Sequence, residues 1–126
     1  MSRVRPRRSA FDDPALRRSQ ELAFEAERMP RPTPAGYGSE ARALLARAAR
    51  IEERVVGSVA PDKPRTFGLL AASAVALWMK AHEFKHAKRL GEKLLLDSRL
   101  SGGARRRIED ILEMIGLRSS IRTRPT

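Results

Sequence analysis

The segment 82–86 holds the residues whose spacing could support catalysis, because its sequence HEFKH matches the pattern H-E-x-x-H. On a continuous helix, histidines at positions i and i+4 share a face and can bind Zn²⁺, while the glutamate activates the metal-bound water. Glu109 or Glu113, later in the chain, could supply a third ligand. The pattern therefore allows a zinc peptidase, with His82, His86 and Glu109 as the candidate metal ligands.

A second interpretation of this segment gives the histidines no catalytic role. The helical pattern before it ends near Ala81, so residues 82–83 are predicted to form a turn, and the two imidazoles then need not share a helical face. Lys85 would also place a positive charge beside a divalent cation. We favour this interpretation, in which the segment organises a surface, and we expect neither catalytic residues nor a cofactor.

Three consecutive arginines open the last predicted helix: Arg105, Arg106 and Arg107. They follow two glycines, so the free backbone amides at the helix start would lie beside three guanidinium groups. Such an arrangement can bind a phosphate or the carboxylates of a partner. Alternatively, the three side chains extend into solvent or pair with Glu109 and Asp110 one turn later.

The preceding predicted helix carries four cations on its outer face: Lys85, Lys88, Arg89 and Lys93. Together with the arginine triplet they could form a positive stripe that attracts an acidic protein surface or the backbone of RNA or DNA. No aromatic residues alternate with these cations to stack on bases. Any contact with nucleic acid is therefore expected to be independent of sequence and sensitive to salt.

The formal net charge of +11 also has contributions from both ends of the chain. Four arginines near the start are candidates for contacts with a larger assembly: Arg3, Arg5, Arg7 and Arg8. The ends lack hydrophobic periodicity and are predicted to be disordered in isolation. The chain has no cysteine and no apolar run long enough to span a bilayer, so we expect a cytoplasmic protein without a membrane partner.

The elements that would position these residues are predicted to be helices, because alanine and leucine supply most of the apolar residues. A short helix is possible over residues 14–29, capped by Asp13, and it would need a surface to lie against. Four more helices are expected over residues 39–56, 64–81, 83–96 and 104–115. Ser39 is the expected N-cap of the first of these four, and Gly116 the expected stop of the last.

Two of these helices show informative apolar patterns. The helix over 39–56 is expected to bury a stripe at helical spacing: Leu44, Ala48, Ile51 and Val55. The helix over 64–81 is apolar on nearly every side, and a helix without a polar face must lie at the centre of the fold.

The segment from Val75 to Leu96 places Trp78 near the end of one helix and Phe84 at the start of the next. The small residues Ala87 and Gly91 follow at helical spacing. This pattern resembles a tetratricopeptide (TPR) helical hairpin, with one clear repeat. The resemblance implies a scaffold whose groove takes a peptide or a helix from a partner, and it carries over no catalytic residue.

The predicted fold class is therefore all-α, a small antiparallel bundle of about four helices with TPR-like hairpins and disordered basic tails. It divides the chain into a mostly extended arm at 1–38, a helical domain at 39–117 and a tail at 118–126. We expect a non-catalytic adaptor subunit of a larger bacterial complex, which binds a protein partner through the hairpin surface and the tails. The alternatives are a sequence-independent nucleic-acid-binding subunit and the zinc peptidase. The oligomeric state stays open.

Overall fold

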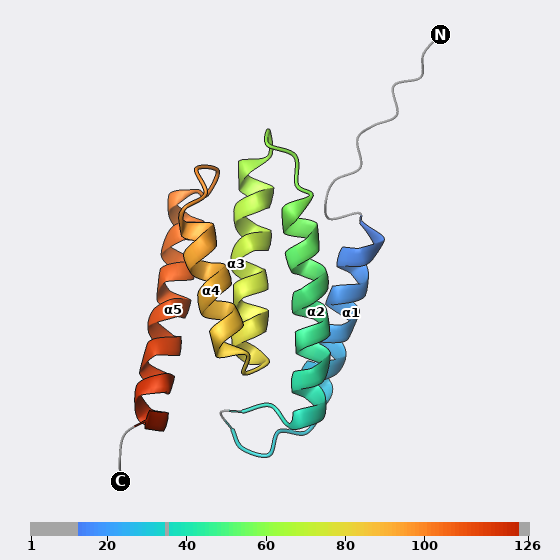
Figure 1. Cartoon of the computed structure of the whole chain (residues 1–126). Helices are drawn as coiled ribbons and strands as arrows, with labels where there is room; N and C mark the ends of the chain where they lie inside the picture. Colours follow the sequence, from blue (N-terminus) through green and yellow to red (C-terminus); the bar gives the residue numbers. More distant parts are fainter. Residues whose placement is uncertain (1–12, 35, 124–126) are drawn as a thin grey trace.

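The computed structural model describes residues 13–34 and 36–123, with side chains to residue 117. Along these residues the chain forms five α-helices: α1 (Pro14–Arg28), α2 (Ser39–Gly57), α3 (Pro64–Lys80), α4 (Phe84–Leu95) and α5 (Gly102–Thr123). Figure 1 shows successive helices running up and down beside one another. The all-α class predicted from the sequence is confirmed.

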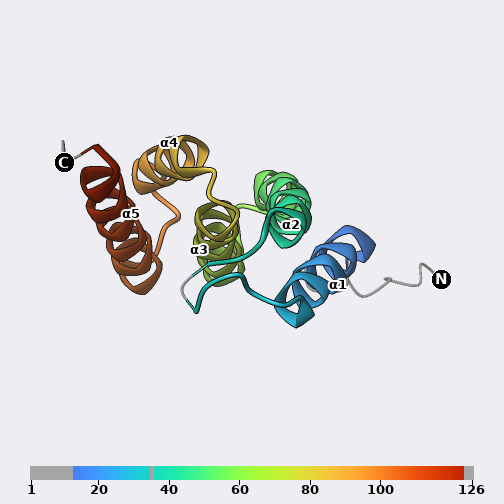
Figure 2. The same cartoon turned by 90° about the horizontal axis from the view of Figure 1, so that it is seen from below.

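The helices are arranged as an array that extends from α1 at one end to α5 at the other (Figure 1). Helix α1 packs on α2, α2 packs on α3, and α3 contacts both α4 and α5, which also contact each other. Figure 2 shows α2 and α4 on one side of the array and α1 and α3 on the other. In the described ranges, no helix has the length and apolar composition needed to cross a bilayer.

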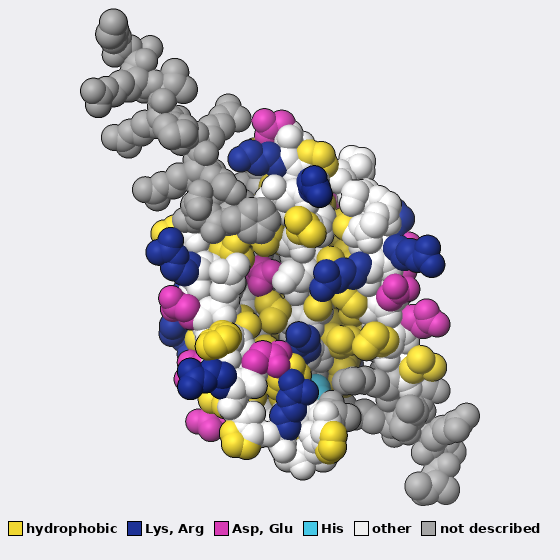
Figure 3. All heavy atoms as spheres, turned by 180° about the vertical axis from the view of Figure 1, so that it is seen from behind, with side chains coloured by type: hydrophobic (Ala, Val, Ile, Leu, Met, Phe, Trp, Pro, Cys, Tyr) yellow, Lys and Arg dark blue, Asp and Glu magenta, His cyan; other side chains and the backbone are white. Residues whose placement is uncertain are grey.

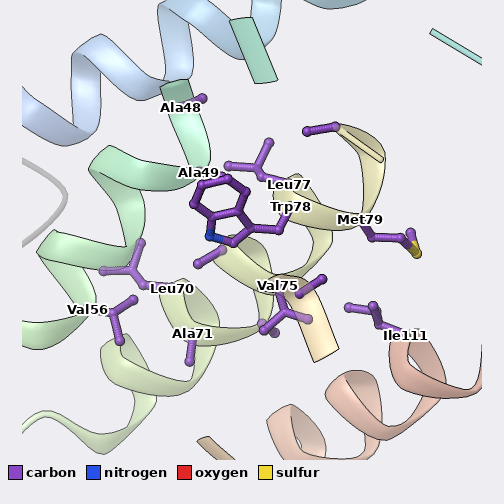
Figure 4. Packing of buried hydrophobic residues seen from close by; sticks show 14 of the residues in the cluster. Ala48, Ala49, Val56, Leu70, Ala71, Val75, Leu77, Trp78, Met79 and Ile111 are labelled. Carbon is purple, nitrogen blue, oxygen red and sulfur yellow. The ribbon is translucent and has the colours of Figure 1, made fainter. Parts of the chain in front are cut away.

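Helix α3 forms the centre of the core, as its apolar sequence predicted. Apart from Leu69, its large apolar side chains are buried, including Phe67 and Trp78. Figure 4 shows Leu70 lying near Val56 of α2, and Val75 near Ile111 of α5. One helix therefore packs its apolar side chains against neighbours on several sides, which removes most of its surface from water.

Two glycines allow close approach at the α5 end of the array. A Cβ atom added at Gly91 of α4 would lie 2.9 Å from Cδ2 of Leu112 in α5. A Cβ atom added at Gly68 of α3 would lie 3.0 Å from Cβ of Ala104 in the same helix. The absence of a side chain at these two positions therefore sets how closely α3 and α4 pack against α5.

Helix α1 differs from the predicted arm, because it is part of the packed array. Its inward side chains Leu16, Leu22 and Ala26 are at most 1% exposed, and Asp13 caps the helix by accepting a 2.8 Å hydrogen bond from the amide of Ala15. The boundary predicted at residue 38 therefore lies between α1 and α2, the helix on which α1 packs. The amphipathic pattern that needed such a surface finds it on α2.

The linker after α1 is held by a polar cluster around Glu27. The hydroxyl of Tyr37 donates to Oε1 of Glu27 at 2.6 Å, and Arg31 donates to Oε2 at 2.9 Å. Lys80 at the end of α3 lies 3.6 Å from the same carboxylate. The hydrogen bond from Tyr37, with the neighbouring cations, lowers the pKa of Glu27. The linker is thereby tied to both α1 and α3.

The predicted N-cap of α2 and both predicted ends of α5 were wrong. Helix α2 has Gly38 as its N-cap, so Ser39 is its first helical residue and makes no capping hydrogen bond. Helix α5 begins at Gly102 and continues through Gly116 to Thr123, so residues 118–123 of the predicted tail are helical. Glycine stops a helix by adopting a positive φ, and no described glycine does so.

The buried stripe of α2 is partly the predicted one, because Ala48 and Val55 are buried as expected. Leu45 and Glu52 are buried, whereas Leu44 and Ile51 are only half-buried. The stripe is shifted and broad because α2 packs against α1 on one side and α3 on the other.

Candidate partner-binding surface

The segment 82–86 does not form the continuous helix that the zinc pattern needs. Helix α3 ends at Lys80 and α4 begins at Phe84, and between them His82 has a φ of 62°, which lies in the left-handed region. The predicted turn is therefore confirmed. No group of three or more potential metal ligands comes together among the residues that the structure describes, and this includes the candidate set with Glu109.

The two imidazoles instead contact side chains of α2 and α3. Nδ1 of His82 lies 3.3 Å from Nη1 of Arg42, near the start of α2. Nε2 of His86 lies 2.8 Å from Oε1 of Glu53, and its ring stacks on Trp78 with 3.9 Å between the centroids. The histidines therefore join α4 and the turn before it to the rest of the array.

Glu53 is the central polar residue of this joint. Its Oε1 atom accepts a 3.0 Å hydrogen bond from the indole Nε1–H of Trp78 as well as the contact with His86. Trp78 is only 4% exposed, so this carboxylate satisfies a donor that has little access to water. One half-exposed glutamate of α2 thus links α3 and α4.

A groove runs between α2 and α4, with α3 as its floor. We call it the α2–α4 groove. It contains a cavity of about 260 Å³, with these lining residues: Glu53, Val56, Gly57, Phe67, Ala74, Leu90, Lys93, Leu94, Asp97 and Arg99. A second, shallower hollow continues it along α4 and adds His86 and Arg89 to the lining. Most of the wall is apolar, and its charged residues come from α2, α4 and the loop after α4.

One end of the groove is closed by Arg99. Its guanidinium lies 3.9 Å from the centre of the Phe67 ring and makes two contacts with Asp97, of 2.9 and 3.1 Å. It also donates to the backbone carbonyl of Val59 at 3.4 Å. The hydrogen bonds from Arg99 lower the pKa of Asp97. Both charges are satisfied within the protein, so Arg99 forms a wall of the groove.

The four cations predicted on α4 are all exposed in the structure: Lys85, Lys88, Arg89 and Lys93. Arg89 and Lys93 line the groove, whereas Lys85 and Lys88 do not. Within the described part of the chain, none of the four has a carboxylate within ion-pair distance. Helix α4 therefore presents unpaired positive charge beside an apolar hollow.

The three arginines of the triplet lie in different surroundings. Nη1 of Arg105 donates a 2.9 Å hydrogen bond to the carbonyl of Leu95, at the C-terminal end of α4. A cation at that position complements the helix dipole and satisfies a free carbonyl. Arg107 lines a hollow between α3 and α5 together with Arg65, and Arg106 is exposed. The three side chains therefore serve different surroundings.

On the face of the array opposite the groove, α3 is exposed between α1 and α5. Hydrophobic side chains gather there among scattered charges (Figure 3), and Leu69 of α3 is 52% exposed. Leu69 lies between the hollow at α5 and another hollow between α1 and α3. The second hollow reaches Glu52, a carboxyl whose pKa is raised by burial, against the effect of hydrogen bonds from Ser73 and Ser19.

The candidate tail residues Arg3, Arg5, Arg7 and Arg8 lie outside the described residues. Glu53, Arg99 and the groove itself were not predicted from the sequence, although Lys93, which lines the groove, was predicted on the outer face of α4. No family model, no curated protein and no solved structure matches this chain.

Proposed function

We propose that this chain is a non-catalytic interaction module that binds a protein partner through α4 and the groove beside it. The observation that supports the proposal is that α4 carries cations directly beside an apolar hollow. No carboxylate of the described residues lies within ion-pair distance of Arg89 or Lys93. Both cations border a hollow whose wall is largely apolar. A protein-binding site usually has an apolar centre surrounded by a polar rim.

A nucleic-acid backbone is the second candidate, because the same four cations would attract phosphates. Single-stranded nucleic acid is normally held by exposed aromatic rings as well as by charge. Here Trp78 is buried in the core and Phe67 is covered by Arg99. A backbone would therefore use the cations of α4 and leave the apolar wall without a contact, which makes this candidate weaker.

Affinity capture from cells of the source organism tests the proposal when it is combined with matched charge reversals. Arg89→Glu with Lys93→Glu changes the groove, and Arg17→Glu with Arg28→Glu makes the same change in net charge on α1. We expect specific partner proteins to be retained by the wild type and by the α1 variant but lost from the groove variant. Equal loss from both variants would show non-specific electrostatic attraction and would contradict the proposal.

A salt titration separates the two candidates. We expect weak binding of the purified chain to random-sequence DNA, with an affinity that falls steeply as salt is raised. Capture of the protein partner should be less sensitive to salt, because apolar contact is not screened. If capture is abolished by nuclease treatment, the partner is a nucleic acid and the second candidate replaces the first.

A further inference from the structure

We propose that the α2–α4 groove binds an acidic segment of the partner, with one large apolar side chain in the groove and flanking carboxylates on Arg89 and Lys93. This inference rests on the proposed function and names the chemistry of the segment that the module recognises. It follows from the charges at the groove, from the size of the hollow and from its wall.

The charges at the groove divide into a satisfied set and an unsatisfied set. Glu53 accepts from Trp78 and contacts His86, and Asp97 is held by Arg99. Both acidic groups of the lining are therefore already used within the protein. Arg89 and Lys93 pair with no carboxylate in the described part of the chain, so the charge that the groove still lacks is negative. Arginine binds a carboxylate through two parallel hydrogen bonds, and lysine contributes a point charge beside it.

The hollow has the size and surface that a single large side chain requires. Its volume is about 260 Å³, and Val56, Leu90 and Leu94 contribute to the apolar part of its wall. A cavity of roughly 150 Å³ lined by such residues is enough to hold a benzene molecule. A leucine or phenylalanine side chain of the partner would thus remove apolar surface on both molecules from water.

The position of the charges relative to the hollow sets the spacing of the segment. Arg89 and Lys93 are four residues apart on α4, and Leu90 lies next to them on the same wall. An apolar side chain that contacts Leu90 would therefore place its flanking residues within reach of Arg89 and Lys93. A segment with one central apolar residue and acidic neighbours on both sides matches this order.

The test uses synthetic peptides and the single tryptophan of the chain. The first peptide is a soluble 12-residue sequence of Asp and Glu with one central leucine. In the second, each acidic residue is replaced by its amide. In the third, the leucine is replaced by serine. A random-sequence oligonucleotide is the fourth ligand. The Nε1–H resonance of Trp78 reports on the groove, because its acceptor Glu53 lines the hollow.

We expect only the first peptide to shift this resonance in a saturable manner. Lys93→Gln should weaken its binding about two- to fivefold, because one exposed ion pair is lost. Combining Arg89→Gln with Lys93→Gln should weaken it further. Lys88→Gln is the matched control, since Lys88 is exposed on the same helix but does not line the groove, and it should leave binding unchanged.

Several outcomes would overturn the inference. These are equal binding of the serine or the amide peptide, an equal shift with the oligonucleotide, no shift with any peptide, and equal weakening by Lys88→Gln. The proposed function can be judged separately with Leu90→Gln in the capture experiment. If the native partner is lost with the charge reversal at Arg89 and Lys93 but kept with Leu90→Gln, the interaction module stands and the apolar insertion fails.

Discussion

Two glutamates that are neighbours in the sequence have opposite environments. Glu52 is buried under α1 and α3, where it meets the hydroxyls of Ser19 and Ser73. Glu53 is half-exposed at the α2–α4 groove, where it satisfies Trp78 and contacts His86. One side chain therefore carries a cost of desolvation, and the other bridges three helices.

Replacing Glu52 by glutamine should stabilise the fold at neutral and alkaline pH. Burial raises the pKa of Glu52, so the native state keeps this proton to a higher pH than the unfolded chain does. The free energy of unfolding of the wild type therefore falls as the pH rises through that raised pKa. Glutamine has no proton to lose, so the advantage of Glu52→Gln should be smallest in acid and should grow as the pH rises.

Urea denaturation at a series of pH values, followed by circular dichroism, measures this difference. Glu25→Gln on the exposed side of α1 is the control for the loss of one surface carboxylate. A constant difference between Glu52→Gln and the wild type across the series would show that Glu52 is not desolvated.

Glu53 permits a second prediction at the residue scale. Glu53→Ala leaves the buried Nε1–H of Trp78 without its acceptor, and such a loss costs about 1–3 kcal/mol in the free energy of unfolding. Glu53→Gln keeps an amide oxygen that can accept the same hydrogen bond, so it should cost less. Denaturation followed by the fluorescence of Trp78 gives both values. Equal costs would mean that the acceptor is unimportant.

At the scale of elements, contacts between helices depend on positions where a side chain is absent. Gly91 of α4 lies against Leu112 and Ile108 of α5. Gly116 of α5 is also helical, but a Cβ added there would meet no described atom within 4 Å outside its own helix. The same residue type is therefore required for packing at one position and unfavourable at the other.

These two glycines should respond oppositely to a larger residue. Gly91→Val overpacks the interface between α4 and α5 and should lower the free energy of unfolding by about 1–3 kcal/mol. Gly116→Ala removes backbone entropy from the unfolded chain and should raise it by about 0.5–1 kcal/mol. Thermal and urea denaturation of both variants check the signs. Stabilisation by Gly91→Val would show that α4 and α5 are less closely packed.

At the scale of the whole molecule, α1 and α5 lie at opposite ends of the array, and α3 connects its two halves. Leu22 of α1 is 1% exposed, whereas Phe24 on the same helix is 65% exposed. If α1 folds together with the rest of the array, a destabilising change at Leu22 must shift the unfolding transition that Trp78 in α3 reports.

Leu22→Ala should therefore lower the free energy of unfolding by about 2–5 kcal/mol when Trp78 fluorescence follows the transition. Phe24→Ala should change it by less than about 0.5 kcal/mol, because an exposed side chain loses little on truncation. The wild type and both variants should unfold in a single transition. An unchanged transition for Leu22→Ala would mean that α1 is an independent arm.

The sequence was sufficient for the fold class and for most of the helices. Asp13 marked the start of α1, and the apolar sequence of α3 marked the centre of the core. The turn at residues 82–83 also followed from the sequence. These features are local, since capping, propensity and periodicity act within a few turns of helix.

Other features depended on which helices became neighbours. The pattern of α1 showed that it needed a surface, but only packing showed that α2 provides it. The burial of Glu52 and the exposure of Glu53 could not be separated by periodicity, because α2 is covered on two sides.

Sequence by itself determined that this chain is helical, that α3 is central and that α4 carries its cations outward, because each property belongs to one segment. Tertiary structure alone decided that Arg105 caps α4 and that Arg99 closes a groove on Phe67. It also decided that Arg89 and Lys93 have no ionic partner among the residues that the structure describes. The partner of a charged side chain can come from a segment that is distant in the sequence. Which charges pair is therefore decided only when the helices pack together.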